Sequence, residues 1–438
     1  MTSIFRRRRT AAVIAVTLTA VTALAACGSS KKSSGGGGGG STTTGDSSAP
    51  GVTATSVLLG TTQPLTGPAA PGYSKISAAM TAYFNYANAQ GGINGRKVTL
   101  KVMDDGYNPA TTATDTRQLV LQDKVFALVG ALGTPTHTAV LDFIKTNKVP
   151  DLFVASGSRS WNQPTKYPTT FGWQPNYTIE GKILGDYVKK TFTGKKVCTF
   201  GQGDDFGTDG AEGVAKTVGS TLASKQTYTP TNTNVAPQIG ALKAAGCEVV
   251  VSFSIPGFTA LALGTAAKIG YKAQWVVSNV GSDIVTLTGF LKDATKPLLE
   301  GVVSDTYLPV PSDTSSSWIQ LFQKVAKDYD NNAPFDGNVL YGMGVAYTFL
   351  QALQAAGKNL TRGSLLAAVE KGGFAGPGLV PFQFSSTNHS GYGGAQIVTI
   401  SGGVAKTTGS VYTTDDGAGA LTEVTGAATT APTNGLPS

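Results

Sequence analysis

The chain alternates between short, continuous apolar runs and longer segments in which apolar residues recur on one face. Residues 125–130 (VFALVG) form one such run, as is typical of a buried parallel strand. Residues 110–124 before it have the apolar spacing of a helix, and residues 97–103 are rich in β-forming side chains. These three segments predict a strand–helix–strand unit, and the recurrence of such units along the chain predicts an α/β fold.

The alternation comes in two successive sets, with a restart after Tyr167 and Pro168. Two such sets predict two doubly wound, Rossmann-like lobes with parallel sheets. Ligands bind in lobes of this kind at the loops that follow the carboxyl ends of strands. The predicted strands are residues 56–62, 97–103, 125–130 and 149–155 in the first set and 196–201, 225–229, 247–253 and 275–278 in the second, followed by 302–307, 381–384 and 396–400.

The first 27 residues have the three parts of an export signal. Four arginines at residues 6–9 precede an apolar core at 11–23, which is too short for a comfortable membrane span. The following Leu-Ala-Ala-Cys resembles a bacterial lipobox, which implies cleavage before Cys27 and lipidation of its thiol. An ordinary secretory signal with an incidental cysteine is the alternative, and the arginine pairs also permit a twin-arginine route.

Two segments outside the alternating pattern cannot bury a core. Residues 29–50 contain six consecutive glycines and almost no apolar side chain, so we expect a flexible tether. From Tyr412 onward the chain is again rich in Gly, Ala and Thr, and we expect this tail to fray.

Composition excludes several classes of function. The 438 residues carry a net charge of +8, but four of the positive charges lie in the export signal, so no nucleic-acid surface is expected. The two histidines, His137 and His389, are far apart in sequence and join no cysteine cluster, so we expect neither metal nor cofactor. The chain has no Gly-x-Ser-x-Gly elbow and no P-loop, which argues against an enzyme. His137, beside threonines at a helix start, is expected to be a polar surface residue.

Three motifs together resemble a known family. They are PLTGP at residues 64–68, GGINGRKVTLKVMDDGYNP at 91–109 and GDDFG at 203–207. Their order resembles the type I periplasmic binding proteins, in particular the leucine/isoleucine/valine-binding branch that serves ABC importers. The resemblance covers residues 56–400 and implies two lobes joined by three hinge crossovers, with a solute bound between the lobes as they close.

The resemblance also implies where the lobes begin and end. Crossovers should fall near residues 171–175, 301–309 and 373–381. We therefore expect a signal peptide at 1–26, a lipidated cysteine and tether at 27–54, lobe 1 at 55–172 with 303–374, lobe 2 at 173–302 with 375–410, and a low-complexity tail at 411–438.

In the family the first lobe receives a solute carboxylate on loop hydroxyls and backbone N–H groups, which favour an anion at helix starts. The matching positions here are Thr134, Gly157 and Ser158, and Tyr73 matches an aromatic wall position. Each hydroxyl taken alone more often caps a helix or turn. Two such loops in consecutive strand–helix units favour a binding site.

The positions that match the second lobe of the family depart from its pattern. Phe206 matches an aromatic cover but lacks a phenolic hydroxyl, and Ile255 stands where an aromatic is expected. Asn279 stands where an acidic residue holds the α-ammonium of an amino acid. An ammonium buried without a counter-charge is costly. The sequence therefore predicts a carboxylate without an α-ammonium, an amide or an aromatic acid at least as readily as a branched-chain amino acid.

Cys198 and Cys247 both fall in the second lobe, on strands that we expect to be neighbours. An oxidised pair is permitted outside the cytoplasm. A disulfide and two buried free thiols remain alternatives at this point.

These observations predict an extracytoplasmic solute-binding protein, lipid-anchored to the outer face of a bacterial cell membrane, that delivers a small polar solute to an ABC importer. We expect a monomer whose partners are the solute, the permease subunits and, through the lipid alone, the membrane. A sensor that signals to a membrane partner is the alternative, and an α/β enzyme is a more remote one.

Overall fold

The computed structural model describes residues 49–331, 333–426 and 429–437. These residues belong to one compact unit that spans Asp46–Ser438. The predicted export signal, the lipidated Cys27 and most of the tether lie outside the described residues. Among the residues that are described, no helix is both long and apolar enough to cross a membrane.

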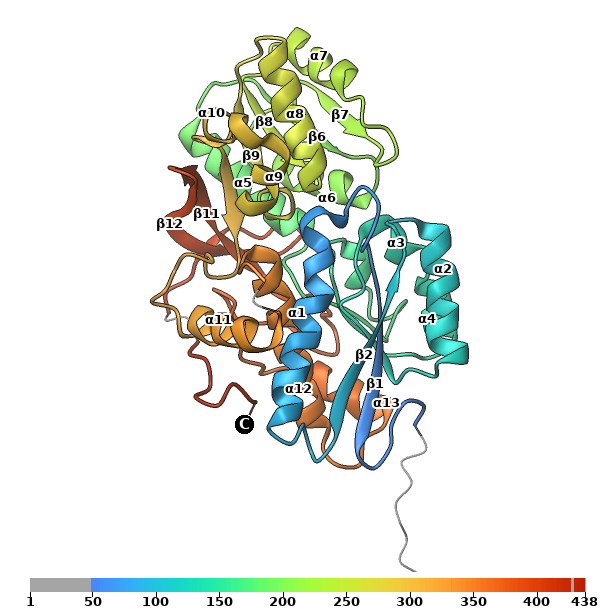
Figure 1. Ribbon diagram of the computed structural model, residues 1–438. Coiled ribbons are helices and arrows are strands. Elements are labelled where there is room, and N and C mark those ends of the chain that lie inside the picture. Colours follow the sequence, from blue (N-terminus) through green and yellow to red (C-terminus); the bar gives the residue numbers. More distant parts are fainter. Residues whose placement is uncertain (1–48, 332, 427–428, 438) are drawn as a thin grey trace, which may run out of the picture. The chain divides into compact units, whose positions relative to one another are not determined.

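The first lobe contains a five-stranded parallel sheet with the order β2-β1-β3-β4-β5. In Figure 1 its strands run beside α1 on one side and α2 and α4 on the other. The short inner strands are wholly buried, because helices cover both faces of the sheet. The strands are β1 (Ser56–Gln63), β2 (Lys97–Asp104), β3 (Ala127–Val129), β4 (Asp151–Val154) and β5 (Thr170–Gly172).

The second lobe contains an eight-stranded sheet with the order β13-β12-β11-β10-β9-β8-β6-β7. Strands β6, β7, β8, β9 and β10 are parallel to one another. Strands β11, β12 and β13 add an antiparallel edge next to β10. The strands are β6 (Val197–Gln202), β7 (Lys225–Tyr228), β8 (Val249–Phe253), β9 (Gln274–Val277), β10 (Val303–Thr306), β11 (Gly394–Ser401), β12 (Val404–Thr413) and β13 (Thr422–Glu423).

The helices follow the predicted alternation, with some differences at their ends. A π-helical turn, η1, takes the second half of the helix predicted at 110–124. The first-lobe helices are α1 (Ala70–Ala89), α2 (Pro109–Arg117), η1 (Gln118–Gln122), α3 (Thr134–Thr138), α4 (Leu141–Thr146), η2 (Arg159–Trp161), α11 (Ser317–Tyr329), α12 (Gly337–Ala356) and α13 (Arg362–Lys371). The second-lobe helices are α5 (Tyr177–Thr191), α6 (Asp205–Thr217), α7 (Ala236–Ala244), α8 (Pro256–Lys268), η3 (Asn279–Gly281), α9 (Ile284–Leu291), η4 (Lys292–Ala294) and α10 (Thr295–Leu299).

The chain passes between the lobes at three places. It leaves the first sheet after β5 and enters α5, returns after β10 to α11, and re-enters the second sheet at β11. One expected boundary is wrong: β10 was assigned to lobe 1, but it pairs with β9 and β11 in the second sheet. Local pattern could not reveal this, because a buried strand reads the same in either sheet.

The C-terminal tail is not frayed over its described residues, contrary to expectation. Strand β12 extends to Thr413, and the Nζ of Lys182 donates to the main-chain oxygens of Asp415 (2.8 Å) and Gly419 (2.7 Å). Farther along, the indole N–H of Trp318 donates to the Thr429 carbonyl oxygen at 2.9 Å. The tail therefore contacts α5 of the second lobe and α11 of the first.

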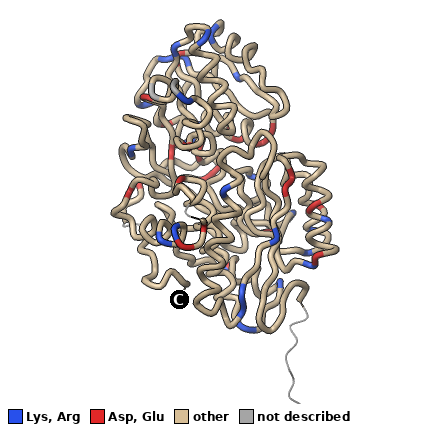
Figure 2. Tube along the Cα trace, viewed as in Figure 1, with Lys and Arg blue, Asp and Glu red and all other residues tan. Residues whose placement is uncertain are grey.

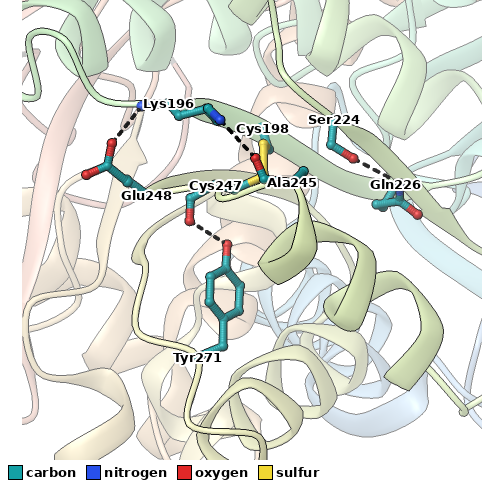
Figure 3. Close-up of a disulfide and its surroundings, with 8 residues drawn as sticks. All are labelled: Lys196, Cys198, Ser224, Gln226, Ala245, Cys247, Glu248 and Tyr271. Atoms are coloured by element: carbon teal, nitrogen blue, oxygen red, sulfur yellow. Dashed lines mark hydrogen bonds between the residues drawn. A yellow bond between two sulfur atoms is a disulfide. The ribbon is translucent and has the colours of Figure 1, made fainter.

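Cys198 and Cys247 form a disulfide in the second lobe, with Cα atoms 5.8 Å apart (Figure 3). Cys198 lies on β6, and Cys247 lies two residues before the start of the neighbouring strand β8. The hydroxyl of Tyr271 donates to the Cys247 carbonyl oxygen at 2.9 Å, as Figure 3 shows. Pairing of these strands brings together two residues that are 49 positions apart.

The expectation that His137 is a surface residue is wrong. Its side chain is 1% exposed, and its Nε2 lies 2.8 Å from Oδ2 of Asp151 on β4. The indole of Trp161 packs edge-on against the imidazole, with ring centroids 5.0 Å apart. The described residues contain no group of three or more His, Cys, Asp or Glu side chains that could hold a metal.

Candidate functional site

A cavity of about 310 Å³ lies between the two lobes, where the loops at the carboxyl ends of their strands face each other. It is lined from the first lobe, the second lobe and the segment that follows β10, as expected for a ligand site at strand ends. Most of its wall is apolar or aromatic. Five of the seven residues expected to contact a solute line it: Tyr73, Thr134, Phe206, Ile255 and Asn279.

Hydroxyl groups gather on the first-lobe side of the cavity. Thr134 begins α3 directly after β3, and its Oγ1 lies 2.8 Å from Oγ of Ser156, which follows β4. The Tyr177 hydroxyl donates to the same Ser156 oxygen at 3.3 Å. Burial raises the pKa of Tyr177 to about 12, so its hydroxyl keeps its proton at neutral pH. The cluster can therefore donate hydrogen bonds to a solute oxygen.

Two tyrosines of the first lobe reach across the cavity to the second lobe. The Tyr73 hydroxyl, on α1, donates to the carbonyl oxygen of Val280 at 2.7 Å. The Tyr107 hydroxyl accepts from Nε2 of Gln202, at the end of β6, at 3.1 Å. Tyr107 has a φ of 62°, which for a non-glycine residue costs on the order of 1–3 kcal/mol. Asp105 Oδ1 accepts the Tyr107 N–H at 2.9 Å and helps to hold this strained turn, which points the ring into the cavity.

The second-lobe wall is made by strand-end residues that are almost fully buried. Phe206, in the first turn of α6, packs on the Tyr177 ring with centroids 4.5 Å apart. Ile255 precedes α8, and its N–H donates to the Tyr228 hydroxyl at 3.0 Å. Phe206 and Ile255 both line the cavity, and each is only 1% exposed. They therefore give this wall of the cavity an apolar surface.

Asn279 follows β9 and binds two carboxyl groups. Its backbone N–H donates to Oε1 of Glu180 (2.8 Å) and to Oδ1 of Asp305 (3.1 Å). Its Nδ2 donates to Oε1 of Glu180 (2.8 Å) and to Oδ2 of Asp305 (3.3 Å). An acid is thus absent from position 279 but present beside it in space, where Asp305 lines the cavity with Asn279.

Gly157 and Ser158 do not line the cavity, although both were expected to contact a solute. A Cβ at Gly157 would lie 2.7 Å from the Pro175 oxygen and 2.8 Å from the Tyr177 ring, so this glycine makes room for Tyr177. The Ser158 hydroxyl donates to Oδ2 of Asp205 in the second lobe at 3.2 Å. The turn after β4 thus places Gly157 against the start of α5 and Ser158 against α6.

Arg159 extends this contact between the lobes. Its Nη2 lies 2.7 Å from Oδ1 of Asp209 and 2.7 Å from Oε2 of Glu212, both on α6. Its backbone N–H also donates to Asp209 at 3.1 Å. The residues after β4 therefore bridge the lobes in this closed arrangement. Lys and Arg are otherwise scattered along the trace in Figure 2, with no continuous basic band on the side shown.

Several cavity residues were missed by the analysis of the sequence: Tyr107, Gln174, Tyr177, Asp305, Tyr307 and Tyr341. Asp305 could have been found, because it lies near the carboxyl end of the strand predicted at 302–307, and the strand-end rule identified Thr134. Tyr341 could not, since it lies within the continuous apolar pattern of α12. Tyr177 and Tyr307 lie at crossovers between the lobes, where no periodic pattern indicates which way a side chain points.

Comparison with known proteins places this geometry among binding proteins. A family model described as periplasmic binding protein matches residues 56–405. The Leu/Ile/Val-binding protein homolog 2 of Brucella abortus (strain 2308) is 25% identical over 338 residues, which cover 74% of this chain and 85% of the relative.

Solved structures show the same fold. A branched chain amino acid ABC transporter protein from Thermus thermophilus with bound valine has a TM-score of 0.73 and 20% identity, covering 82% of this chain and 97% of its own. A fatty acid ABC transporter substrate-binding protein from Thermomonospora curvata has a TM-score of 0.72 and 22% identity, covering 84% and 95%. These matches confirm the predicted α/β fold with parallel-strand sheets. The two neighbours differ in their named solutes, which are a branched chain amino acid for one and a fatty acid for the other.

Proposed function

The chain belongs to the periplasmic binding protein family, and from this premise we propose that it is a lipid-anchored receptor that delivers a small solute to an ABC importer. The solute is an amino acid, an amide or a small carboxylate, held between two lobes that close over it. The receptor acts as a monomer and binds reversibly, without making or breaking a bond. The family and the structural neighbours are binding proteins and not enzymes, in agreement with the expectation from the sequence that this chain is not an enzyme.

The cavity between the lobes carries this proposal. Its volume of about 310 Å³ suits a small molecule. Hydroxyl groups of Thr134 and Tyr177 lie on one side, the amide of Asn279 and the carboxyl of Asp305 lie on another, and aromatic side chains fill the wall between them. A solute with an apolar body and polar ends matches this arrangement.

A solute of this class should raise the melting temperature without being turned over. Saturation at 100 times the Kd adds about 2.7 kcal/mol to the free energy of unfolding, because only the folded protein binds. The measurement is a thermal-shift screen over amino acids, their amides, short carboxylates and aromatic acids, with each stabilising compound recovered and analysed by mass spectrometry. Recovery of a chemically altered compound would contradict the proposal and favour an enzyme.

Matched phenylalanine variants test whether the stabilising compound occupies the cavity. Phe206→Ala removes a cavity wall and should weaken binding at least about tenfold, since a buried aromatic side chain contributes several kcal/mol of apolar contact. Phe290→Ala in the same lobe is the control, because Phe290 is 41% exposed and does not line the cavity. Equal effects of the two variants would place the compound elsewhere.

The lipid anchor rests on Leu24-Ala25-Ala26-Cys27, which directly follows an apolar signal core. Because only a cysteine thiol accepts the lipid, Cys27→Ala should move the protein from the membrane fraction to the soluble extracytoplasmic fraction. Fractionation of producing cells, together with mass spectrometry of the mature N-terminus, measures this. A variant that stays on the membrane would exclude Cys27 as the anchor.

A further inference from the structure

Two carboxyl groups lie beside Asn279 on the second-lobe side of the cavity: Glu180 from α5, which does not line the cavity, and Asp305 from β10, which does. Both side chains are buried, at 0% and 2% exposure, and both accept hydrogen bonds from Asn279. Each of the two Asn279 donors thus reaches both carboxyl groups, which places the two groups close together. Two buried carboxylates at such close range repel each other, so the pair retains one proton.

We assign the proton to Glu180, the member of the pair that does not line the cavity. Burial, followed by the neighbouring charge of Asp305, raises the pKa of Glu180 well above its usual range. Burial raises the pKa of Asp305 to about 6. At pH 7 Asp305 is therefore mainly ionised, and it is the member of the pair that lines the cavity. The pKa of Asp305 is higher in the folded protein than in an unfolded chain. Ionisation of Asp305 therefore lowers the free energy of unfolding as the pH rises from about 4 to about 6.

The cavity offers no cation to balance that charge. Among the residues that the structure describes, those lining the cavity include no Lys, Arg or His. Lys75, beside the cavity, pairs with Asp336. Lys182 lies two residues after Glu180 on α5, but its ammonium group binds Asp415 and the carbonyl oxygens of the tail.

Asp336 and Asp283 are the other carboxylates that line the cavity, and each has its own hydrogen-bond donors. Asp336 has its ion pair with Lys75 and also accepts the backbone N–H groups of Asn338 and Val339 at 3.0 Å. Asp283 accepts the N–H and the hydroxyl of Thr286 at 2.8 and 2.6 Å. Asp283 also lacks an ion pair, but it is only partly buried, whereas Asp305 is 2% exposed and accepts hydrogen bonds from Asn279 alone among the described side chains. Asp305 is therefore the buried cavity carboxylate that has no cation beside it.

We propose that Asp305, held in position by Asn279 and Glu180, is the anionic group of the solute site and selects solutes that carry a protonated amine. The proposal rests on the receptor function proposed above and narrows its solute class. It reverses the expectation drawn from Asn279, because the charge absent at position 279 is supplied from another strand. The hydroxyl cluster at Thr134 and Tyr177 remains available for an oxygen at the other end of the solute.

Few other groups can titrate beside this site between pH 5 and 7. Tyr307, after β10, faces Asp305 and Glu180, and Tyr341 of α12 faces Tyr307; burial raises the pKa of both phenols, so they stay neutral. Asp105, in the turn that holds Tyr107, also has a pKa raised by burial to about 6. Burial also raises the pKa of Asp336, which lines the cavity, and of Asp204, so a pH effect that persists in an Asp305 variant would belong to one of these other buried carboxyls.

The experiment compares two matched sets of three probes by isothermal titration calorimetry on the whole mature protein. One set is L-phenylalanine, 3-phenylpropanoate and 2-phenylethylamine, and the other is L-leucine, 4-methylpentanoate and 3-methylbutylamine. Each set contains an amino acid, the acid without its amine and the amine without its carboxylate. The proteins are the wild type, Asp305→Asn and the control Glu248→Gln, which alters an exposed carboxyl of the same lobe that pairs with Lys195.

In at least one set the amine-bearing probes should bind the wild type at least about tenfold more tightly than the acid at pH 7.5, since a buried charge pair gains more than 1.4 kcal/mol. Asp305→Asn should remove that preference, and Glu248→Gln should retain it. The wild-type affinity for the amines should fall about tenfold from pH 7 to pH 5, because the ionised fraction of a group with a pKa of about 6 falls from about nine-tenths to about one-tenth. This pH profile is independent of whether the variant folds.

Other results separate the two proposals. Acids that bind as tightly as the matching amino acids, an amine preference that survives Asp305→Asn, or affinities that do not change between pH 7 and 5 would each overturn the role of Asp305 while the receptor function stands. Failure of every probe in both sets, with the protein folded, would count against the receptor function and this inference together.

Discussion

Replacing Trp173 by alanine is expected to lower the free energy of unfolding by about 3–5 kcal/mol, the range for large buried aromatic residues. Trp173 lies between β5 and α5 and is fully buried. Its indole N–H donates to Oγ1 of Thr348 at 3.0 Å, and its ring packs edge-on against Tyr341 at 4.9 Å and Tyr392 at 5.2 Å. It thereby joins the first crossover to α12 and to the segment that leads into β11.

The measurement is denaturant unfolding followed by far-ultraviolet circular dichroism, which does not depend on the indole itself. Trp173→Phe is the matched comparison: it keeps an aromatic ring but removes the hydrogen bond to Thr348, so its loss should be clearly smaller. Glycines on both sides leave no room for compensating side chains, because a Cβ at Gly344 would lie 2.9 Å from the indole and one at Gly391 would meet the Trp173 oxygen. A loss below about 1 kcal/mol for Trp173→Ala would show that this junction contributes little.

Removing the Cys198–Cys247 disulfide is expected to lower the free energy of unfolding by up to about 4 kcal/mol, because the bond closes a loop of about 50 residues in the unfolded chain. The loop contains β6, α6, β7 and α7, and therefore Phe206 of the cavity wall. Denaturant midpoints are compared for the oxidised protein, the reduced protein and Cys198→Ala/Cys247→Ala.

Protein that begins at Gly28 contains only these two cysteines, so thiol counting is direct. Alkylation under denaturing conditions without reductant should leave its mass unchanged, and reduction should expose two reactive thiols. Labelling of both cysteines before reduction would mean that the pair is free in solution. A double variant as stable as the oxidised protein would mean that the bond adds nothing to folding.

The second-lobe site shows where inference from sequence stops. Asn279 was correctly located at a strand end beside the cavity, and its neutral side chain suggested a site without a counter-charge. Glu180 and Asp305 stand 99 and 26 positions from it in sequence, yet both accept its hydrogen bonds. No periodic pattern connects residues so far apart. The order of the strands, with β10 beside β9, brings Asp305 to Asn279, and the packing of α5 against β10 brings Glu180 there.

The first lobe allowed more to be predicted. Its short apolar runs indicated β3 and β4, and the loops after them contain Thr134 and Ser156, which lie in hydrogen-bond contact. The rule that ligands bind at the carboxyl ends of parallel strands located this side of the cavity. It did not reveal that Gly157 packs against Tyr177 and Ser158 against α6, because the direction of a loop depends on the elements against which it packs.

The sequence by itself determined the α/β class, the two sets of strands and helices, the family and several of the strand-end residues around the cavity. These features follow from local hydrophobic periodicity and from motifs of contiguous residues. The tertiary structure alone decided the pairing of Asp305 with Glu180, the place of β10 in the second sheet, the contacts of the tail and the burial of His137. Each of these depends on contacts between segments distant in the chain, whose energies arise only when the sheets and helices have packed.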